Sequence, residues 1–190
     1  MLKTLLAVLL CGVSLAVATT GVADDGMPFR DGERVLFLGD SITNDGTYAA
    51  IIEFYLWQKY PDRDITVINL GLSSETVSGI TEPVHPFPRP NVFYRLETAL
   101  RISRPNWVVA CYGMNDGIYR PVNDEIKDKF RGGIQQLVDR CEAFGARVIL
   151  ATPPFFDAQA PRAQKGMRDL KDKEPYGFRR VYEAYNDETL

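Results

Sequence analysis

Short apolar runs alternate with longer segments of helical spacing, and this alternation restricts the fold more than any other feature of the sequence. Each run carries apolar residues on both faces and ends at a glycine, a proline or a polar loop. Strands that are apolar on both faces need cover on both sides, which predicts a parallel sheet between two layers of helices. The expected strands are 34–38, 65–70, 107–111 and 147–151, and the expected helices are 47–60, 92–102 and 124–144.

Composition excludes several classes of protein. Of the 190 residues, 45% are hydrophobic and 25% are charged, which is ordinary for a soluble globular domain. The 22 Lys and Arg residues stand against 25 Asp and Glu residues, so the chain has no basic field for nucleic acid. Cys111 lies in an expected strand and Cys141 in an expected helix, which favours buried free thiols over a disulfide.

The first 23 residues have the pattern of a secretory signal. Lys3 precedes an uncharged apolar stretch at 4–18, and Gly21 and Ala23 supply the small residues of a cleavage site. The apolar stretch is too short to span a membrane comfortably, and a second possible cut follows Ala18. We therefore expect an exported protein, periplasmic or extracellular, with a mature domain at 24–190 and no stable membrane insertion after signal removal.

Polar residues follow each of the first three expected strands. Ser41 lies on a strand-to-helix turn, where its hydroxyl has the position of a nucleophile or, alternatively, of a helix N-cap. Gly71 follows the second strand and offers a backbone N–H, and Asn115 follows the third and offers a side-chain amide; simple turn chemistry is the alternative for both. The carboxyl ends of parallel strands share one edge of the sheet, so the three loops should converge. A nucleophile with two N–H donors indicates acyl transfer through an oxyanion.

These residues also carry a family resemblance. Gly39-Asp40-Ser41-Ile42-Thr43, Asn69-Leu70-Gly71 with Thr76, and Gly113-Met114-Asn115-Asp116 resemble the first three blocks of the SGNH (GDSL-type) hydrolases. The resemblance implies a three-layer α/β/α sandwich with a parallel, flavodoxin-like sheet. It implies Ser41 as nucleophile, with Ser41 N–H, Gly71 N–H and the Asn115 amide as the oxyanion hole. Members of this family are esterases, lipases, thioesterases and carbohydrate deacetylases, and they need no metal or other cofactor.

The fourth block of that family, D-x-x-H, is missing from this sequence. The chain has a single histidine, His85, which lies in Glu82-Pro83-Val84-His85-Pro86, between the second and third blocks. A loop histidine that lines the site or is solvated is the favoured interpretation, and a rearranged triad using His85 is the alternative. We expect the chain to be the amino-terminal part of a longer hydrolase that lacks the last strand and the catalytic Asp/His loop.

Two other functions stay open at this stage. An SGNH-like domain without its base would bind acylated glycans without cleaving them, and residues 39–44 would serve a flavodoxin-like phosphate or nucleotide binder as an anion nest. Export and the polar loops weakly favour a small ester, such as an acetylated sugar, as the small-molecule or glycan substrate. The sequence leaves the oligomeric state open.

Overall fold

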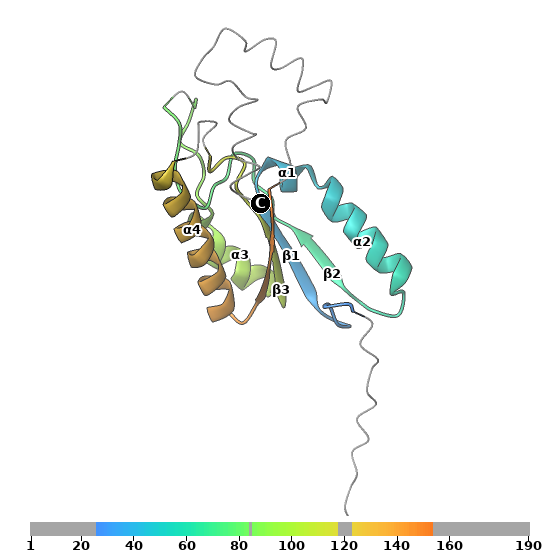
Figure 1. The fold of residues 1–190 in the computed structure, drawn as a ribbon. Helices are drawn as coiled ribbons and strands as arrows, with labels where there is room; N and C mark the ends of the chain where they lie inside the picture. The colour runs from blue at the N-terminus through green and yellow to red at the C-terminus, as the bar shows by residue number, and fades with distance from the viewer. Residues whose placement is uncertain (1–25, 84, 118–122, 154–190) are drawn as a thin grey trace, which may run out of the picture.

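The computed structural model describes residues 26–83, 85–117 and 123–153. The predicted signal sequence and the stretch after residue 153 lie outside these residues. The described part contains a parallel four-stranded sheet in the order β2-β1-β3-β4, with helices on both faces (Figure 1), so the predicted α/β fold is confirmed. The strands are β1 (Arg34–Gly39), β2 (Thr66–Asn69), β3 (Trp107–Cys111) and β4 (Arg147–Ala151).

The three expected helices are present, but one of them is divided, and a short helix, α1 (Ser41–Asp45), was not expected. The expected helix 92–102 is divided at Arg95, whose backbone leaves the helical region with φ −126° and ψ −11°. The Arg95 side chain at this break is bound to Glu75, 20 residues earlier in the chain. The helices are α1 (Ser41–Asp45), α2 (Thr47–Lys59), the 3₁₀ helix η1 (Val92–Tyr94), α3 (Leu96–Ser103) and α4 (Asp124–Ala143).

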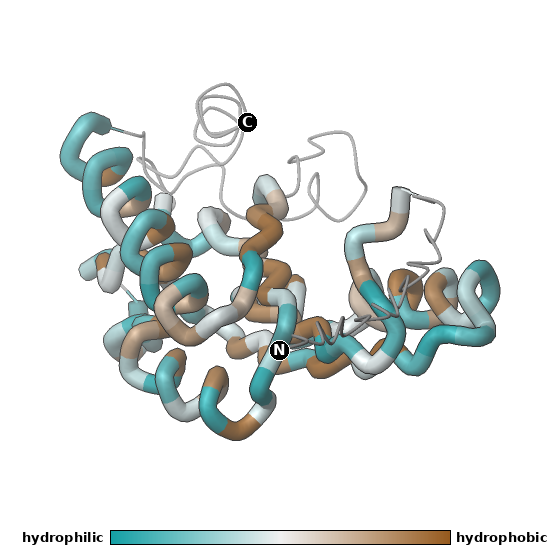
Figure 2. The backbone as a smooth tube through the Cα atoms, turned by 90° about the horizontal axis from the view of Figure 1, so that it is seen from below, coloured by the Kyte–Doolittle hydropathy of each residue, from teal (hydrophilic) through white to brown (hydrophobic). Residues whose placement is uncertain are grey.

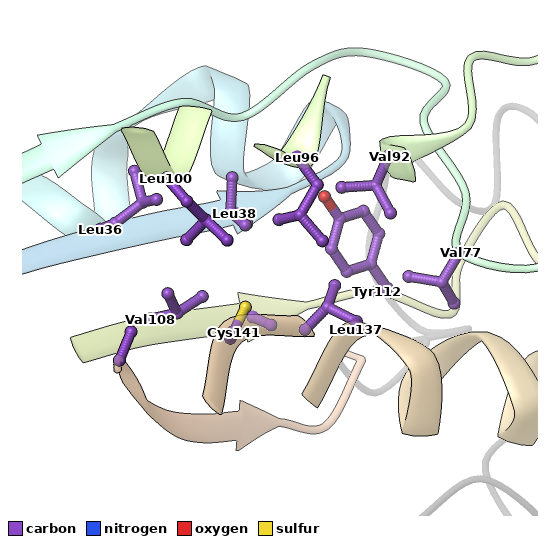
Figure 3. Close-up of a cluster of buried hydrophobic side chains, with 12 residues drawn as sticks. Leu36, Leu38, Val77, Val92, Leu96, Leu100, Val108, Tyr112, Leu137 and Cys141 are labelled. Atoms are coloured by element: carbon purple, nitrogen blue, oxygen red, sulfur yellow. The ribbon is translucent and has the colours of Figure 1, made fainter. Parts of the chain in front are cut away.

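Two apolar cores lie on opposite faces of the sheet. Because side chains alternate along a strand, Leu36 and Leu38 face α3 and α4, whereas Val35 and Phe37 face α2. Figure 2 shows the hydrophobic strands gathered between the helices, and Figure 3 shows the α3–α4 core. This core includes Tyr112, whose ring is buried among leucine and valine side chains. The sheet is thus held from both sides, as strands apolar on both faces require.

The apolar face that the helical spacing predicts for α2, made of Ala50, Ile51, Phe54 and Leu56-Trp57, is largely wrong. Leu56 is buried, but Ile51, Phe54 and Trp57 are 62%, 59% and 58% exposed. The helix is apolar on nearly all sides, so the sequence does not indicate which side meets the sheet. The sheet selects the side of the helix that carries Ala49 and Leu56, seven residues apart and on the same face.

The two described cysteines are free and buried, as the sequence favoured. Burial raises the pKa of both Cys111 and Cys141 to about 11, so both thiols stay protonated at neutral pH. Among the helices of the described residues, none has the length and apolar character to cross a membrane.

Candidate active site

The strand order brings the three polar loops together. β1 lies between β2 and β3 and pairs with both in parallel, so the loops that leave these strands start side by side at one edge of the sheet. The second loop is tied to the end of β1 by a hydrogen bond from Leu72 N–H to the Gly39 carbonyl at 2.9 Å. The predicted convergence of the loops is confirmed.

Ser41 is the first residue of α1 and is exposed. The preceding residue, Asp40, caps the helix by accepting a hydrogen bond from the Ile42 N–H at 2.9 Å. A Cβ on Gly39 would lie 2.0 Å from Thr43 Oγ1, so the turn requires glycine at that position. The capping role therefore belongs to Asp40, and no residue of the described ranges is hydrogen-bonded to the Ser41 hydroxyl.

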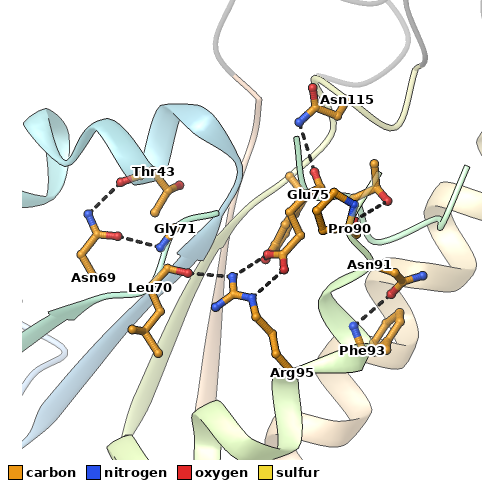
Figure 4. Close-up of polar contacts among 12 residues, drawn as sticks. Thr43, Asn69, Leu70, Gly71, Glu75, Pro90, Asn91, Phe93, Arg95 and Asn115 are labelled. Carbon is orange, nitrogen blue, oxygen red and sulfur yellow. Dashed lines mark hydrogen bonds and ion pairs between the residues drawn. The ribbon is translucent and has the colours of Figure 1, made fainter. Parts of the chain in front are cut away.

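Gly71 lies against the backbone of α1 (Figure 4). A Cβ built on it would be 2.2 Å from the Asn44 nitrogen and 2.4 Å from the Thr43 carbonyl carbon. Asn69 joins the two loops, because its Nδ2 donates to the Thr43 carbonyl at 2.7 Å and its Oδ1 accepts from the Gly71 N–H at 2.9 Å. The close approach expected of this glycine is made to the serine helix. Its role as an oxyanion donor stays a prediction, since its N–H is bound to Asn69 here.

Replacing Gly71 by alanine should lower kcat for ester hydrolysis by about 100-fold, because the new Cβ displaces the backbone that carries Ser41. The matched control is Gly132→Ala in α4, where a Cβ meets nothing within 4 Å. That variant should keep wild-type kcat and gain roughly 0.5–1 kcal/mol of stability. The measurements are kcat and thermal unfolding of both variants, and a wild-type kcat for Gly71→Ala would contradict the prediction.

Asn115 connects the third loop to the second. Its side chain is buried, and its Nδ2 donates to the Glu75 carbonyl oxygen at 3.1 Å (Figure 4). The amide of Asn115 thus holds the Glu75 backbone beside the serine loop. Donation from this amide to a substrate oxyanion stays a prediction.

A buried network that sequence reasoning missed supports the loops. The Glu75 side chain is fully buried and accepts hydrogen bonds from Arg95 Nε, an Arg95 terminal nitrogen and the Tyr112 hydroxyl, each at 2.6 Å. Arg95 also donates to the Leu70 carbonyl at 2.7 Å, next to Gly71 (Figure 4). A buried carboxylate needs such partners, and here they fix the second loop from beneath. The only feature of the sequence that points to this network is Glu75 itself, a glutamate inside the second loop.

Two further carboxyls are buried beneath the site. Asp116 accepts through Oδ1 from the Val77 and Ser78 N–H groups at 2.9 and 2.7 Å, and its buried Oδ2 has no partner within the described residues. Burial raises the pKa of Asp116. Burial likewise raises the pKa of Asp40 from 3.8 to about 6, against the lowering effect of the Ile42 N–H, and the nearby charge of Asp116 adds to the rise. The serine turn therefore rests on two carboxyls whose pKa values are raised by burial.

The raised pKa of Asp40 predicts a pH-dependent stability. The folded state holds the Asp40 proton more tightly than the unfolded chain does. The stabilisation that this proton provides is therefore fully present below pH 4 and is lost as the pH rises through 6. Asparagine also caps helices but carries no charge. When the pH is raised from 4 to 8, the free energy of unfolding of Asp40→Asn should therefore increase by about 2–3 kcal/mol relative to that of wild type. Urea unfolding at both pH values measures this difference.

The control for that experiment is Asp45→Asn. Asp45 is exposed, and a hydrogen bond from the Thr47 hydroxyl lowers the pKa of its carboxyl. Its replacement should give no gain at high pH. Equal behaviour of the Asp40 and Asp45 variants would show that Asp40 is charged without penalty in the folded protein.

The structure does not assemble Glu82 and His85 into an acid–histidine pair. The Glu82 carboxylate accepts hydrogen bonds from Arg89 Nε at 2.7 Å and from an Arg89 terminal nitrogen at 2.6 Å. Burial alone would raise the pKa of Glu82, but the hydrogen bonds from Arg89 outweigh it and lower the pKa. His85 Nδ1 lies 2.5 Å from the Phe87 carbonyl oxygen instead. A triad rearranged around His85 would therefore lack Glu82 as its acid.

We assign no residue to a metal or another cofactor. Over 26–83, 85–117 and 123–153, no three His, Cys, Asp or Glu side chains are grouped so that they could hold a metal ion.

This chain is similar to a known esterase. An acetylxylan esterase of Geobacillus stearothermophilus is 28% identical over an alignment of 185 residues. The match covers 86% of this chain and 75% of the relative. A crystal structure of that esterase matches with a TM-score of 0.55 at 26% identity, over 86% of this chain and 75% of that one. Three solved variants of the esterase are catalytic mutants, in which an aspartate, a histidine or a serine is replaced by alanine.

A more distant structure supports the fold alone. An α/β hydrolase from the metagenome of Lake Arreo is 23% identical, with a TM-score of 0.54 over 83% of this chain and 76% of that chain. The model of the GDSL-like lipase/acylhydrolase family matches residues 37–189, which include the serine turn and all four strand ends. The chain belongs to the GDSL-like lipase/acylhydrolase family, and its function is that of an esterase.

Proposed function

We propose that this protein is an exported esterase that removes small acyl groups, such as acetyl, from carbohydrates, with Ser41 as its nucleophile. The observation that carries the proposal is the position of Ser41, exposed at the start of α1 while Asp40 caps the helix in its place. The preference for acetylated sugars is supported by the similarity to an acetylxylan esterase.

The reaction would begin with attack of Ser41 Oγ on the ester carbonyl carbon. The carbonyl π electrons move to oxygen, and the oxyanion would accept hydrogen bonds from the N–H groups of Ser41 and Gly71 and from the Asn115 amide. Collapse of this intermediate breaks the bond to the sugar oxygen, which takes up the proton lost by Ser41, so that the sugar alcohol leaves and an acyl-serine remains. Water then attacks the acyl-serine and releases the carboxylic acid. In the resting arrangement the Gly71 N–H is bound to Asn69, so substrate would have to share or replace that bond.

A serine hydroxyl needs a base to accept its proton. We do not assign this role to His85, since its Nδ1 faces the Phe87 carbonyl and Glu82 is bound to Arg89. The catalytic aspartate and histidine described for the Geobacillus esterase are the model for the acid and base of this reaction.

Binding of phosphate at the start of α1 is the weaker alternative. An anion at this position would use the Ile42 N–H, which is already bound to the Asp40 carboxylate. A second carboxyl, Asp116, lies close enough to affect the Asp40 pKa. This negative environment disfavours a phosphate nest.

The experiment that tests the proposal compares substrates on the full-length protein. Release of acetate from acetylated xylooligosaccharides should exceed hydrolysis of p-nitrophenyl palmitate, with Ser41→Ala as the blank. Activity on the long-chain ester alone would refute the small-ester assignment. Mass spectrometry of protein from the periplasm or medium should find Asp24 at the amino terminus, and an intact terminus on cytosolic protein would refute export.

A further inference from the structure

The segment between the second loop and η1 forms a closed loop, which we call the rim loop (described residues 81–83 and 85–90). Its two ends are joined by the Glu82–Arg89 ion pair, whose side chains are only 7% and 3% exposed. Backbone contacts close it further, because Arg89 N–H donates to Thr81 Oγ1 at 2.9 Å and His85 N–H donates to the Glu82 carbonyl at 3.0 Å. A doubly hydrogen-bonded buried ion pair holds its surroundings in one geometry.

The rim loop lies at the same end of the sheet as the serine turn (Figure 1). The Pro90 carbonyl accepts a hydrogen bond from Thr76 N–H at 2.9 Å, one residue beyond the Glu75 carbonyl that binds Asn115. The positive charge of Arg89 lowers the pKa of Asp40, the residue before Ser41. In Figure 1 this green segment lies at the same end of the sheet as α1. A substrate bound at Ser41 therefore has the rim loop as its neighbour.

The hydrogen bond of His85 determines its tautomer. A carbonyl oxygen only accepts, so the contact with the Phe87 carbonyl at 2.5 Å places the ring proton on Nδ1. Nε2 of the neutral ring then carries a lone pair and accepts hydrogen bonds. The His85 and Phe87 rings meet edge to face at 4.5 Å, and Phe87 is 51% exposed. The loop thus presents a fixed acceptor beside an exposed aromatic ring.

We propose that His85 and Phe87 bind the alcohol part of the substrate, with His85 Nε2 accepting a hydrogen bond from a sugar hydroxyl and Phe87 packing against the sugar ring. This assignment rests on the proposed function and names the residues that select for carbohydrate. A sugar offers the hydroxyl donors that Nε2 needs and an apolar C–H face for the aromatic ring. A simple aryl or alkyl alcohol lacks the hydroxyls and gains nothing from His85.

The test compares two acetyl esters on the full-length protein: acetylated xylobiose, and p-nitrophenyl acetate, whose alcohol lacks sugar hydroxyls. His85→Ala should raise KM for acetylated xylobiose about tenfold, as expected for one lost hydrogen bond, and leave kcat within about twofold. Phe87→Ala should raise the same KM by about fivefold. His85→Ala should not change kcat/KM for p-nitrophenyl acetate by more than about twofold, because this alcohol has no hydroxyl to donate to Nε2.

Two controls separate binding from structure. His85→Gln retains an acceptor oxygen near the Nε2 position and should recover most of the affinity. Phe144→Ala removes another exposed phenylalanine, at the end of α4 opposite the strand carboxyl ends, and should change neither substrate. Unchanged thermal unfolding of each variant would confirm that the fold is intact.

Two results would overturn the assignment. A fall in kcat for both esters in His85→Ala would place His85 in the chemical step, and unchanged KM for acetylated xylobiose would remove it from the site. Failure of the proposed function is a different result, because it appears in the wild-type protein as no deacetylation of the sugar.

Discussion

Replacing Ser41 by alanine should lower kcat for ester hydrolysis by about a thousandfold or more, because the reaction loses the atom that forms the acyl intermediate. Stability should stay within about 0.5 kcal/mol of wild type, since Ser41 is exposed and Asp40 supplies the helix cap. Steady-state kinetics with an acetyl ester and urea unfolding measure the two effects. The combination of lost activity and intact stability is what distinguishes a nucleophile from a capping residue.

The matched control is Ser73→Ala, which removes an exposed serine hydroxyl from the neighbouring loop. This variant should keep wild-type activity within about twofold. Substantial activity in Ser41→Ala would mean that another group attacks the ester. A large loss of stability would mean that the Ser41 hydroxyl has a structural partner in the full-length protein.

Replacing Arg89 by methionine should destabilise the fold by about 3–5 kcal/mol, because Glu82 is left as a buried charge without its partner. For a domain of this size, the melting temperature should fall by roughly 10 °C. The rim loop should loosen as well, so KM for an acetylated sugar should rise even where the protein remains folded. Thermal unfolding and kinetics below the melting temperature measure the two effects.

Two comparisons make the Arg89 result specific. Lys129→Met breaks the ion pair with Glu125. The Lys129 side chain is 51% exposed and that of Glu125 is 72% exposed, so the loss of stability should be no more than about 0.5 kcal/mol. The double variant Arg89→Met with Glu82→Met buries no charge and should regain much of the lost stability. If Arg89→Met cost no more than Lys129→Met, the buried ion pair would not stabilise the loop.

The strands were the most predictable elements. The bounds of β3 and β4 are those expected from the sequence, because an apolar run between polar loops is a local signal. The helix at 92–102 was less predictable, since it is divided at Arg95, whose side chain binds a glutamate in another loop. For α2, an apolar surface on nearly every side concealed which residues face the sheet.

The general position of the candidate site followed from the sequence alone. Parallel strands bring their carboxyl ends to one edge, so Ser41, Gly71 and Asn115 were predictable neighbours once the strands were recognised. The signal sequence and the catalytic roles of these three residues remain predictions. The partners of the loops were not predictable, because Tyr112 reaches Glu75 across 37 positions of the chain.

The sequence by itself determined the layers of the fold, the edge of the sheet that carries the polar loops and the residue types available there. Hydrophobic periodicity and turn residues act over a few positions, so these features are visible without coordinates. The tertiary structure decided that Asp40 rather than Ser41 caps α1 and that the Gly71 N–H is bound to Asn69. It also decided that the Glu82 carboxylate binds Arg89 rather than the His85 ring. Each depends on which polar groups the fold brings within hydrogen-bonding distance, and hydrophobic periodicity does not specify those pairs.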